Sequence, residues 1–151
     1  MTPLQQLQQL DLADQRRRFP NLPETLIIKT VYSDKTANAL TKAIIRWVEL
    51  NGGQAERIST QGTFIKGKVV GVGMYGVKQL QGKYVPTQGV KGSADISAII
   101  SGRSVKIEVK MKDKQSPAQI AYQLAIERAG GQYWLVRSFD EFINQWEGLI
   151  L

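Results

Sequence analysis

The stretch SADISAIISGRSVKIEVKMK, residues 93–112, contains two runs of β-forming residues separated by a turn at residues 101–104. If Gly102 and Arg103 form the tip of this hairpin, alternate positions of both strands are apolar and lie on one face. That face is expected to be buried. A slip of one residue would bury the charged positions instead, so the hydrophobic pattern defines which side chains share the other face.

The polar face of this hairpin carries a group of charged side chains. In this register Asp95 faces Lys110 and Ser97 faces Glu108, so the two carboxylates are diagonal neighbours, with roughly 7 to 8 Å between their backbones. Such a pair can bind one hard cation such as Mg²⁺, and a lysine beside the metal can assist the attacking water. The alternative is an ordinary cross-strand ion pair of Asp95 with Lys110, next to a solvated Glu108.

The composition excludes several other kinds of chemistry. The chain has 151 residues and contains neither cysteine nor histidine. These absences exclude a zinc site of the usual Cys/His kind, a disulfide framework, a cysteine nucleophile and a Ser/His/Asp triad. Catalysis must therefore depend on carboxylates, lysine, hydroxyls or a hard metal ion.

The length and the absence of targeting signals favour one soluble domain. A chain of this size buries roughly 70% of its surface on folding, which is enough for a single core. No stretch approaches the roughly 18 apolar residues of a membrane helix, and the N-terminus lacks a signal or transit pattern. We therefore expect a cytoplasmic protein with no membrane partner.

The positive charge of the chain is concentrated in one segment. The formal net charge is +7, and residues 60–114 contain ten lysines and arginines against three acidic residues. The remaining positions carry equal numbers of both signs. This distribution favours a surface that contacts phosphates, with Lys91, Lys112 and Lys114 as candidate nucleic-acid ligands near the hairpin. The alternative is a set of hairpins solvated by lysine.

The rest of the chain predicts an α/β protein. We expect an N-terminal helix up to Arg18, a short strand at residues 26–32, and a helix capped by Asp34 or Thr36. A strand at 55–59 and a glycine-rich β-hairpin or loop follow. Two further capping sequences predict the last helices, which are separated by an apolar strand. We assign residues 1–35 to an N-terminal helical arm with an extended crossing segment and 36–151 to the main domain, which has a mixed central sheet flanked by helices.

Several motifs in this order resemble the PD-(D/E)xK nuclease superfamily. Within this superfamily the chain most resembles the VRR-NUC group, which is itself similar to Holliday-junction resolvases of the archaeal type. It extends from about Thr36 to Glu141, and the matching segments are residues 91–95 (KGSAD), 107–110 (IEVK), 116–119 (SPAQ) and the strand 132–137. The resemblance implies a restriction-endonuclease-like core of helix, three strands, helix and strand, with a glycine-rich hairpin inserted in it.

The resemblance also implies a site. Asp95 and Glu108 would bind Mg²⁺ or Mn²⁺ together with the carbonyl of Val109, and Lys110 would assist the attacking water. Gln119 matches a glutamine that lies near the site in the family. Its place in the Ser116 capping box equally explains it as a helix cap.

Other positions match the family pattern less closely. Arg57 lies where resolvase-like relatives carry an arginine, so we include it among the candidate nucleic-acid-binding residues. The first helix of the family often adds a glutamate to the metal, whereas this chain has Asn38 near that helix start and Glu49 three turns later. Whether one or two ions bind therefore stays open, as does the family's homodimeric state. The N-terminal leucines could serve a dimer or cap the chain's own core.

We therefore expect a Mg²⁺-dependent endonuclease that hydrolyses phosphodiester bonds in DNA, including branched or junction DNA. The alternative is a non-catalytic nucleic-acid-binding module with the same fold, in which the glycine-rich hairpin enters a groove. A nuclease acting on RNA would differ only in its substrate. The few aromatic residues in the basic segment argue against recognition of single strands by stacking.

Overall fold

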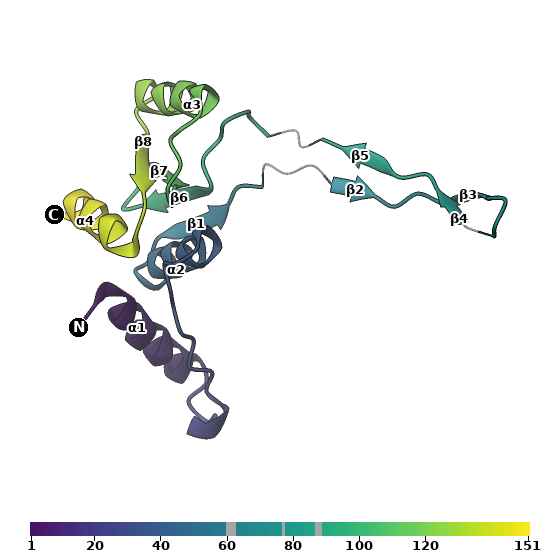
Figure 1. Ribbon diagram of the computed structural model, residues 1–151. Helices are drawn as coiled ribbons and strands as arrows, with labels where there is room; N and C mark the ends of the chain where they lie inside the picture. The colour runs from purple at the N-terminus through teal and green to yellow at the C-terminus, as the bar shows by residue number, and fades with distance from the viewer. Residues whose placement is uncertain (60–62, 77, 87–88) are drawn as a thin grey trace.

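The computed structural model describes residues 1–59, 63–76, 78–86 and 89–151. These ranges form four α-helices, one 3₁₀ turn, a central sheet and a long protruding arm (Figure 1). The helices are α1 (Pro3–Arg18), α2 (Ala37–Leu50), α3 (Pro117–Arg128) and α4 (Phe139–Ile150), with the 3₁₀ turn at Glu24–Leu26. The strands are β1 (Gln54–Arg57), β2 (Thr63–Ile65), β3 (Val69–Val72), β4 (Lys78–Leu80), β5 (Lys83–Val85), β6 (Ile96–Ile100), β7 (Arg103–Val109) and β8 (Gln132–Val136).

The central sheet has the strand order β1-β6-β7-β8. Neighbouring strands are antiparallel from β1 to β7, whereas β7 and β8 are parallel and are connected by α3. Helices α1, α2 and α4 lie on one side of this sheet and α3 lies on the other (Figure 1). The prediction of an α/β fold with a mixed sheet flanked by helices is confirmed.

The core fills the space between the sheet and the helices α1, α2 and α4. It contains the alternate apolar residues of β6 and β7 and a cluster of aromatic rings from α2, β8 and α4. These rings are Trp47, Trp134, Phe139, Phe142 and Trp146. Leu7 of α1 is fully buried in the same cluster, so the N-terminal helix caps the core of its own chain.

The β6–β7 hairpin has a different register from the predicted one. Its loop is Ser101-Gly102, with φ of 49° and 76°, and Ile100 pairs with Arg103. Two left-handed residues are what a tight hairpin turn requires. The pairing is thereby shifted by two residues, so Ile96 pairs with Ile107. Because two is the period of a strand, every side chain keeps its predicted face.

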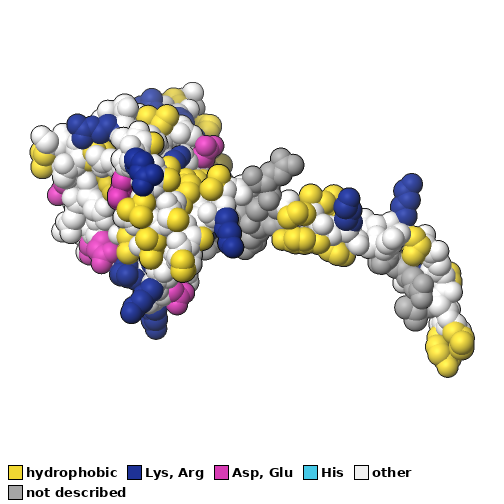
Figure 2. Space-filling view, turned by 90° about the horizontal axis from the view of Figure 1, so that it is seen from above, with side chains coloured by type: hydrophobic (Ala, Val, Ile, Leu, Met, Phe, Trp, Pro, Cys, Tyr) yellow, Lys and Arg dark blue, Asp and Glu magenta, His cyan; other side chains and the backbone are white. Residues whose placement is uncertain are grey.

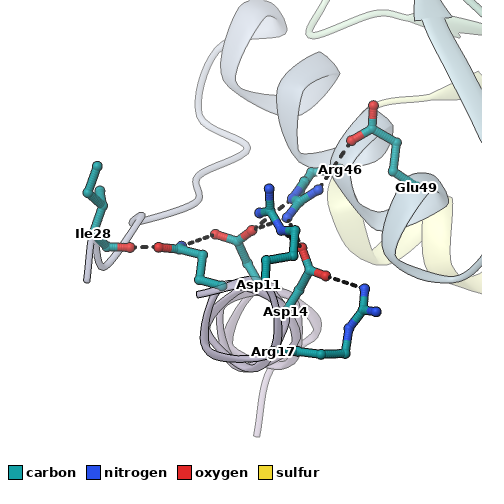
Figure 3. A network of polar contacts seen from close by, with 8 residues as sticks. Asp11, Asp14, Arg17, Ile28, Arg46 and Glu49 are labelled. Atoms are coloured by element: carbon teal, nitrogen blue, oxygen red, sulfur yellow. Dashed lines mark hydrogen bonds and ion pairs between the residues drawn. The ribbon is translucent and has the colours of Figure 1, made fainter. Parts of the chain in front are cut away.

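Helix α1 is joined to α2 by a network of charged side chains (Figure 3). The guanidinium of Arg46 on α2 lies 2.7 Å from Asp11 Oδ1 and 2.8 Å from Asp14 Oδ2. It also approaches Glu49 Oε2 at 3.4 Å. Asp11 is only 5% exposed, so this network fixes α1 against the body of the protein.

The crossing segment after α1 is not a strand. The predicted strand at residues 26–32 was wrong: a 3₁₀ turn ends at Leu26, and the following residues have no strand pairing. Ile28 and Val31 are 73% and 81% exposed. Their β-branched side chains favour an extended backbone, but a strand also needs a partner strand. Within the described residues none is placed beside this segment.

The glycine-rich region between β1 and β6 forms the arm, as its β-hairpin pattern predicted. Two short ladders, β2 with β5 and β3 with β4, carry it away from the body (Figure 1). The surface of the protein is 10471 Å², compared with roughly 7,700 Å² for a compact monomer of this size. In the described part of the chain no helix has the length and apolar character needed to cross a membrane.

Candidate active site at the end of the central strands

Asp95 and Glu108 lie side by side at one end of the β6–β7 hairpin. Continuing the observed register by one step from Ile96 and Ile107 places Asp95 directly opposite Glu108. The predicted diagonal arrangement, with Asp95 facing Lys110, was therefore wrong. Directly opposed residues have Cβ atoms roughly 4.5 to 5.5 Å apart, closer than diagonal ones. The correct register therefore brings the two carboxylates closer together.

The Asp95 side chain is held by the backbone of the neighbouring strand. Its Oδ2 accepts a hydrogen bond of 2.8 Å from the Val109 N–H. The carbonyl of Asp95 also accepts a 2.8 Å hydrogen bond from the Ile58 N–H, just after β1. Asp95 thus contacts residues of, or next to, both neighbouring strands, β1 and β7, at the end of the sheet where these strands terminate. Its carboxylate is fixed beside Glu108.

Glu108 is nearly inaccessible to solvent, with an exposed fraction of 2%. Its Oε1 lies 3.3 Å from Lys110 Nζ and accepts a 2.5 Å hydrogen bond from Gln119 Nε2. Its Oε2 is buried and has no hydrogen-bond partner among the described residues. A buried carboxylate oxygen without a partner costs free energy unless something binds it.

The surroundings of Glu108 raise the pKa of its carboxyl above the ordinary value. Burial is the main cause, because it disfavours the charged form, and the negative charge of Asp95 acts in the same direction. Lys110 and Gln119 oppose this rise. A divalent cation bound beside Glu108 and Asp95 would favour the charged form of the Glu108 carboxyl and so oppose this rise in its pKa.

Gln119 both caps α3 and contacts Glu108. Its Oε1 accepts a 2.9 Å hydrogen bond from the Ser116 N–H, and Ser116 Oγ accepts one of 3.3 Å from the Gln119 N–H. This is the predicted capping box of α3. The other end of the same side chain donates to Glu108. One residue therefore fixes the start of α3 to the carboxylate pair.

Arg57 ends β1 next to Asp95, because Arg57 pairs with Ile96. Its guanidinium donates a 2.8 Å hydrogen bond to Asn38 Oδ1, at the start of α2. The Asn38 oxygen, which could have bound a metal, thus already has a partner. Glu49 pairs with Arg46 in the network with α1.

The candidate phosphate ligands Lys91, Lys112 and Lys114 are exposed. Lys91 precedes Gly92, which has a φ of 79°. A side chain at Gly92 would collide with the backbone of Ala118 on α3. Glycine therefore lets the end of the arm pass directly over the start of α3.

Two residues at this site were missed in the sequence. Tyr133 lies on β8 beside Lys106, and burial raises the pKa of its hydroxyl to about 12. Arg137 directly follows β8 and donates to the Asp113 carbonyl at 3.4 Å. Because β7 and β8 are parallel, their carboxyl ends lie side by side. The residues that follow the two strands could therefore have been predicted to be neighbours, which places Arg137 next to Lys110.

The residues present fit one hard cation. Asp95 and Glu108 supply carboxylate oxygens, and the buried Oε2 of Glu108 has no partner among the described residues. Mg²⁺ and Mn²⁺ prefer such oxygens and commonly keep water or phosphate as further ligands. No cluster of three or more His, Cys, Asp or Glu side chains is present within the described ranges. The carboxylates can therefore supply only part of a coordination sphere.

Comparison with known proteins gives no family assignment. No family model matches the chain, and neither a curated protein nor a solved structure is similar to it.

Proposed function

We propose that this protein is a divalent-metal-dependent endonuclease of the PD-(D/E)xK type that hydrolyses phosphodiester bonds in DNA. The observation that carries the proposal is the carboxylate pair of Asp95 and Glu108, with Lys110 and Gln119 in contact with Glu108. The carboxylate pair lies near exposed lysines of the basic segment, namely Lys91, Lys112 and Lys114. These positive charges favour a polyanionic substrate. Branched or junction DNA is the substrate class that the resemblance to resolvases implies.

Each residue has a distinct role in this proposal. Asp95 and Glu108 would hold Mg²⁺ or Mn²⁺ through their carboxylates, with the Val109 carbonyl next to them. When bound, such an ion polarises phosphoryl oxygens and lowers the pKa of water. Gln119 orients Glu108 by holding its Oε1 at 2.5 Å, which leaves Oε2 for the ion.

Lys110 places a positive charge 3.3 Å from Glu108 Oε1. In the proposed reaction the oxygen of water forms a bond with phosphorus and gives up a proton to solvent, while the bond from phosphorus to the leaving oxygen breaks and that oxygen takes a proton from solvent. The ammonium group orients the attacking water and offsets the negative charge that develops on the phosphoryl oxygens. Arg57, Lys91, Lys112 and Lys114 contact the phosphates on either side.

The test is a cleavage assay on supercoiled, linear, flap and four-way junction DNA with Mg²⁺, with Mn²⁺ and with chelator. We expect cleavage that requires the metal and that falls at least 100-fold in Asp95→Asn and Lys110→Ala. Asp113→Asn is the matched control, because Asp113 is an exposed acid in the same segment. DNA left intact under all conditions, or cleavage retained in both site variants, would contradict the proposal.

The alternative of a non-catalytic binding module is supported by one observation. Oε1 of Glu108 already has two partners, Lys110 and Gln119, without any ligand, as a purely structural role requires. A binding module would hold DNA equally well with chelator and with metal, with an affinity that depends on salt. Binding without cleavage by the wild-type protein would favour this function.

A further inference from the structure

The arm between β1 and β6 has an unusual charge composition. Residues 58–94 contain five lysines and no arginine, aspartate or glutamate. All five lysines are exposed, and they are Lys66, Lys68, Lys78, Lys83 and Lys91. A surface with this one-sided charge attracts a polyanion and repels a second copy of the same arm.

In its described parts the arm is a two-stranded ribbon. Phe64 pairs with Tyr84 in the inner ladder, and Val72 pairs with Lys78 in the outer one. Between the ladders a side chain at Gly67 would overlap the backbone of Gln81, so the two legs lie very close together. Lysines occur in both ladders and between them, at Lys66, Lys68, Lys78 and Lys83, and Figure 2 shows blue side chains on the surface of the arm.

The tip of the arm is apolar and fully accessible. Met74 and Tyr75 are 94% and 90% exposed, and the Gly76 N–H closes the turn on the Gly73 carbonyl at 3.0 Å. The end of the arm in Figure 2 is correspondingly covered by hydrophobic atoms. Proteins that bind the minor groove of DNA frequently insert apolar side chains of this kind between base steps.

The arm begins and ends next to the carboxylate pair. Its first leg follows Ile58, whose N–H donates to the Asp95 carbonyl at 2.8 Å. Its second leg returns over the start of α3 at Gly92, and α3 carries Gln119. A ligand held along the arm therefore extends from the candidate active site.

We propose that the arm is a clamp for duplex DNA, in which the lysines contact phosphates and Met74 and Tyr75 enter a groove. The inference rests on the proposed function, because it names the form of DNA that the site receives. Fully extended, residues 63–76 would span roughly 46 to 50 Å, compared with roughly 34 Å for one duplex turn. Two-stranded ribbons of other DNA-binding proteins enter the major or the minor groove.

The first test measures binding of a labelled 30-base-pair duplex by fluorescence anisotropy in chelator, where no cleavage occurs. Lys68→Gln/Lys78→Gln should reduce the slope of log affinity against log salt by about 1.8, because each phosphate contact contributes about 0.9. Affinity should fall roughly 10- to 60-fold at 0.1 M salt. The matched control is Arg103→Gln/Arg128→Gln, which removes two exposed cations from the opposite end of the sheet and should change neither value.

The second test addresses the tip. Met74→Ala/Tyr75→Ala should weaken duplex binding about tenfold while leaving the salt slope unchanged, because no charge is removed. Ile120→Ala/Leu124→Ala is its control, since these α3 side chains are 47% and 55% exposed but lie outside the arm. Circular dichroism and sedimentation of each variant establish that the fold and the mass in solution are unchanged.

The outcomes separate the clamp from the nuclease. A normal salt slope in Lys68→Gln/Lys78→Gln, with metal-dependent cleavage intact in the wild type, overturns the clamp alone. If that variant has the reduced salt slope and the wild-type protein does not cleave DNA, the clamp is supported and the nuclease is overturned. If arm variants change the mass in solution but not DNA affinity, the arm binds a second copy and the clamp is overturned.

Discussion

Gln119 Nε2 lies 2.5 Å from Glu108 Oε1, while Oε1 of the same glutamine accepts the Ser116 N–H at 2.9 Å. The second contact fixes which end of the amide faces Glu108. The capping of α3 and the orientation of the candidate metal ligand thus depend on one side chain. A single change can separate these two roles, because glutamate is also a capping residue at this helix position.

We predict that Gln119→Glu keeps α3 folded but lowers the rate of DNA cleavage at least tenfold. The new carboxylate still accepts the Ser116 N–H, but the donor to Glu108 is lost and a third negative charge faces the pair. Gln119→Ala should also lose the hydrogen bond from the Ser116 N–H, which is one half of the capping box, at a cost of about 1 kcal/mol in the free energy of unfolding. Cleavage rates and urea denaturation measure the two effects.

The control for this prediction is Gln5→Glu. Gln5 occupies the same position in the capping box of α1, where its Oε1 accepts the Thr2 N–H at 2.8 Å. That box is exposed and far in sequence from the carboxylates, so stability and cleavage should both be retained. Normal cleavage by Gln119→Glu would show that Gln119 is only a helix cap.

A second prediction concerns binding of the cation without any DNA. Mn²⁺ at 100 times its dissociation constant should stabilise the wild-type protein by about 2.7 kcal/mol. For a chain of this length that corresponds to a rise in Tm of about 5 to 10 °C. Asp95→Asn should abolish the rise, and Asp113→Asn should retain it. Calorimetric titration gives the affinity directly, and an equal rise in Asp95→Asn would place the cation elsewhere.

The sequence predicted the faces of the β6–β7 hairpin but not its register. Alternation of apolar residues specifies a face, and a shift by two residues leaves every face unchanged. Gly102 could serve either as the first or as the second loop residue. Gly102 is the second loop residue because Ser101 takes the first position with a positive φ. A positive φ is uncommon for serine, so the sequence did not predict this turn.

Other differences from the prediction come from contacts between distant segments. Residues 26–32 have the composition of a strand, but whether a partner strand exists is decided elsewhere in the chain. The helices were predictable because their caps are local, as at Thr36, which accepts the Ala39 N–H at 3.2 Å. The pairing of Asn38 with Arg57 and the contact of Gln119 with Glu108 required the assembled sheet.

The observed turn gives a third prediction. Ser101→Asn should stabilise the protein by about 0.5 kcal/mol, because asparagine tolerates the left-handed conformation and Asn-Gly is the preferred loop. Gly102→Ala should destabilise it by about 1 to 2 kcal/mol through backbone strain alone, since an added Cβ meets open space there. An added Cβ at Gly148 also meets open space, but Gly148 lies within α4. Gly148→Ala should therefore increase the stability of the protein, because alanine has the higher helix propensity. Unchanged stability in Gly102→Ala would contradict the observed register.

The fourth prediction tests the junction between α1 and α2. Arg46→Met should lower the free energy of unfolding by about 3 kcal/mol, because it leaves the nearly buried Asp11 without its charged partner. Arg17→Ala removes only an exposed cation from Asp14 and should leave the urea midpoint unchanged. The double variant Asp11→Asn/Arg46→Met should lose less than the sum of its single changes, since both act on one contact. Equal stability of Arg46→Met and Arg17→Ala would mean that apolar packing, chiefly of Leu7 and Leu4, holds α1 in place without the ion pairs.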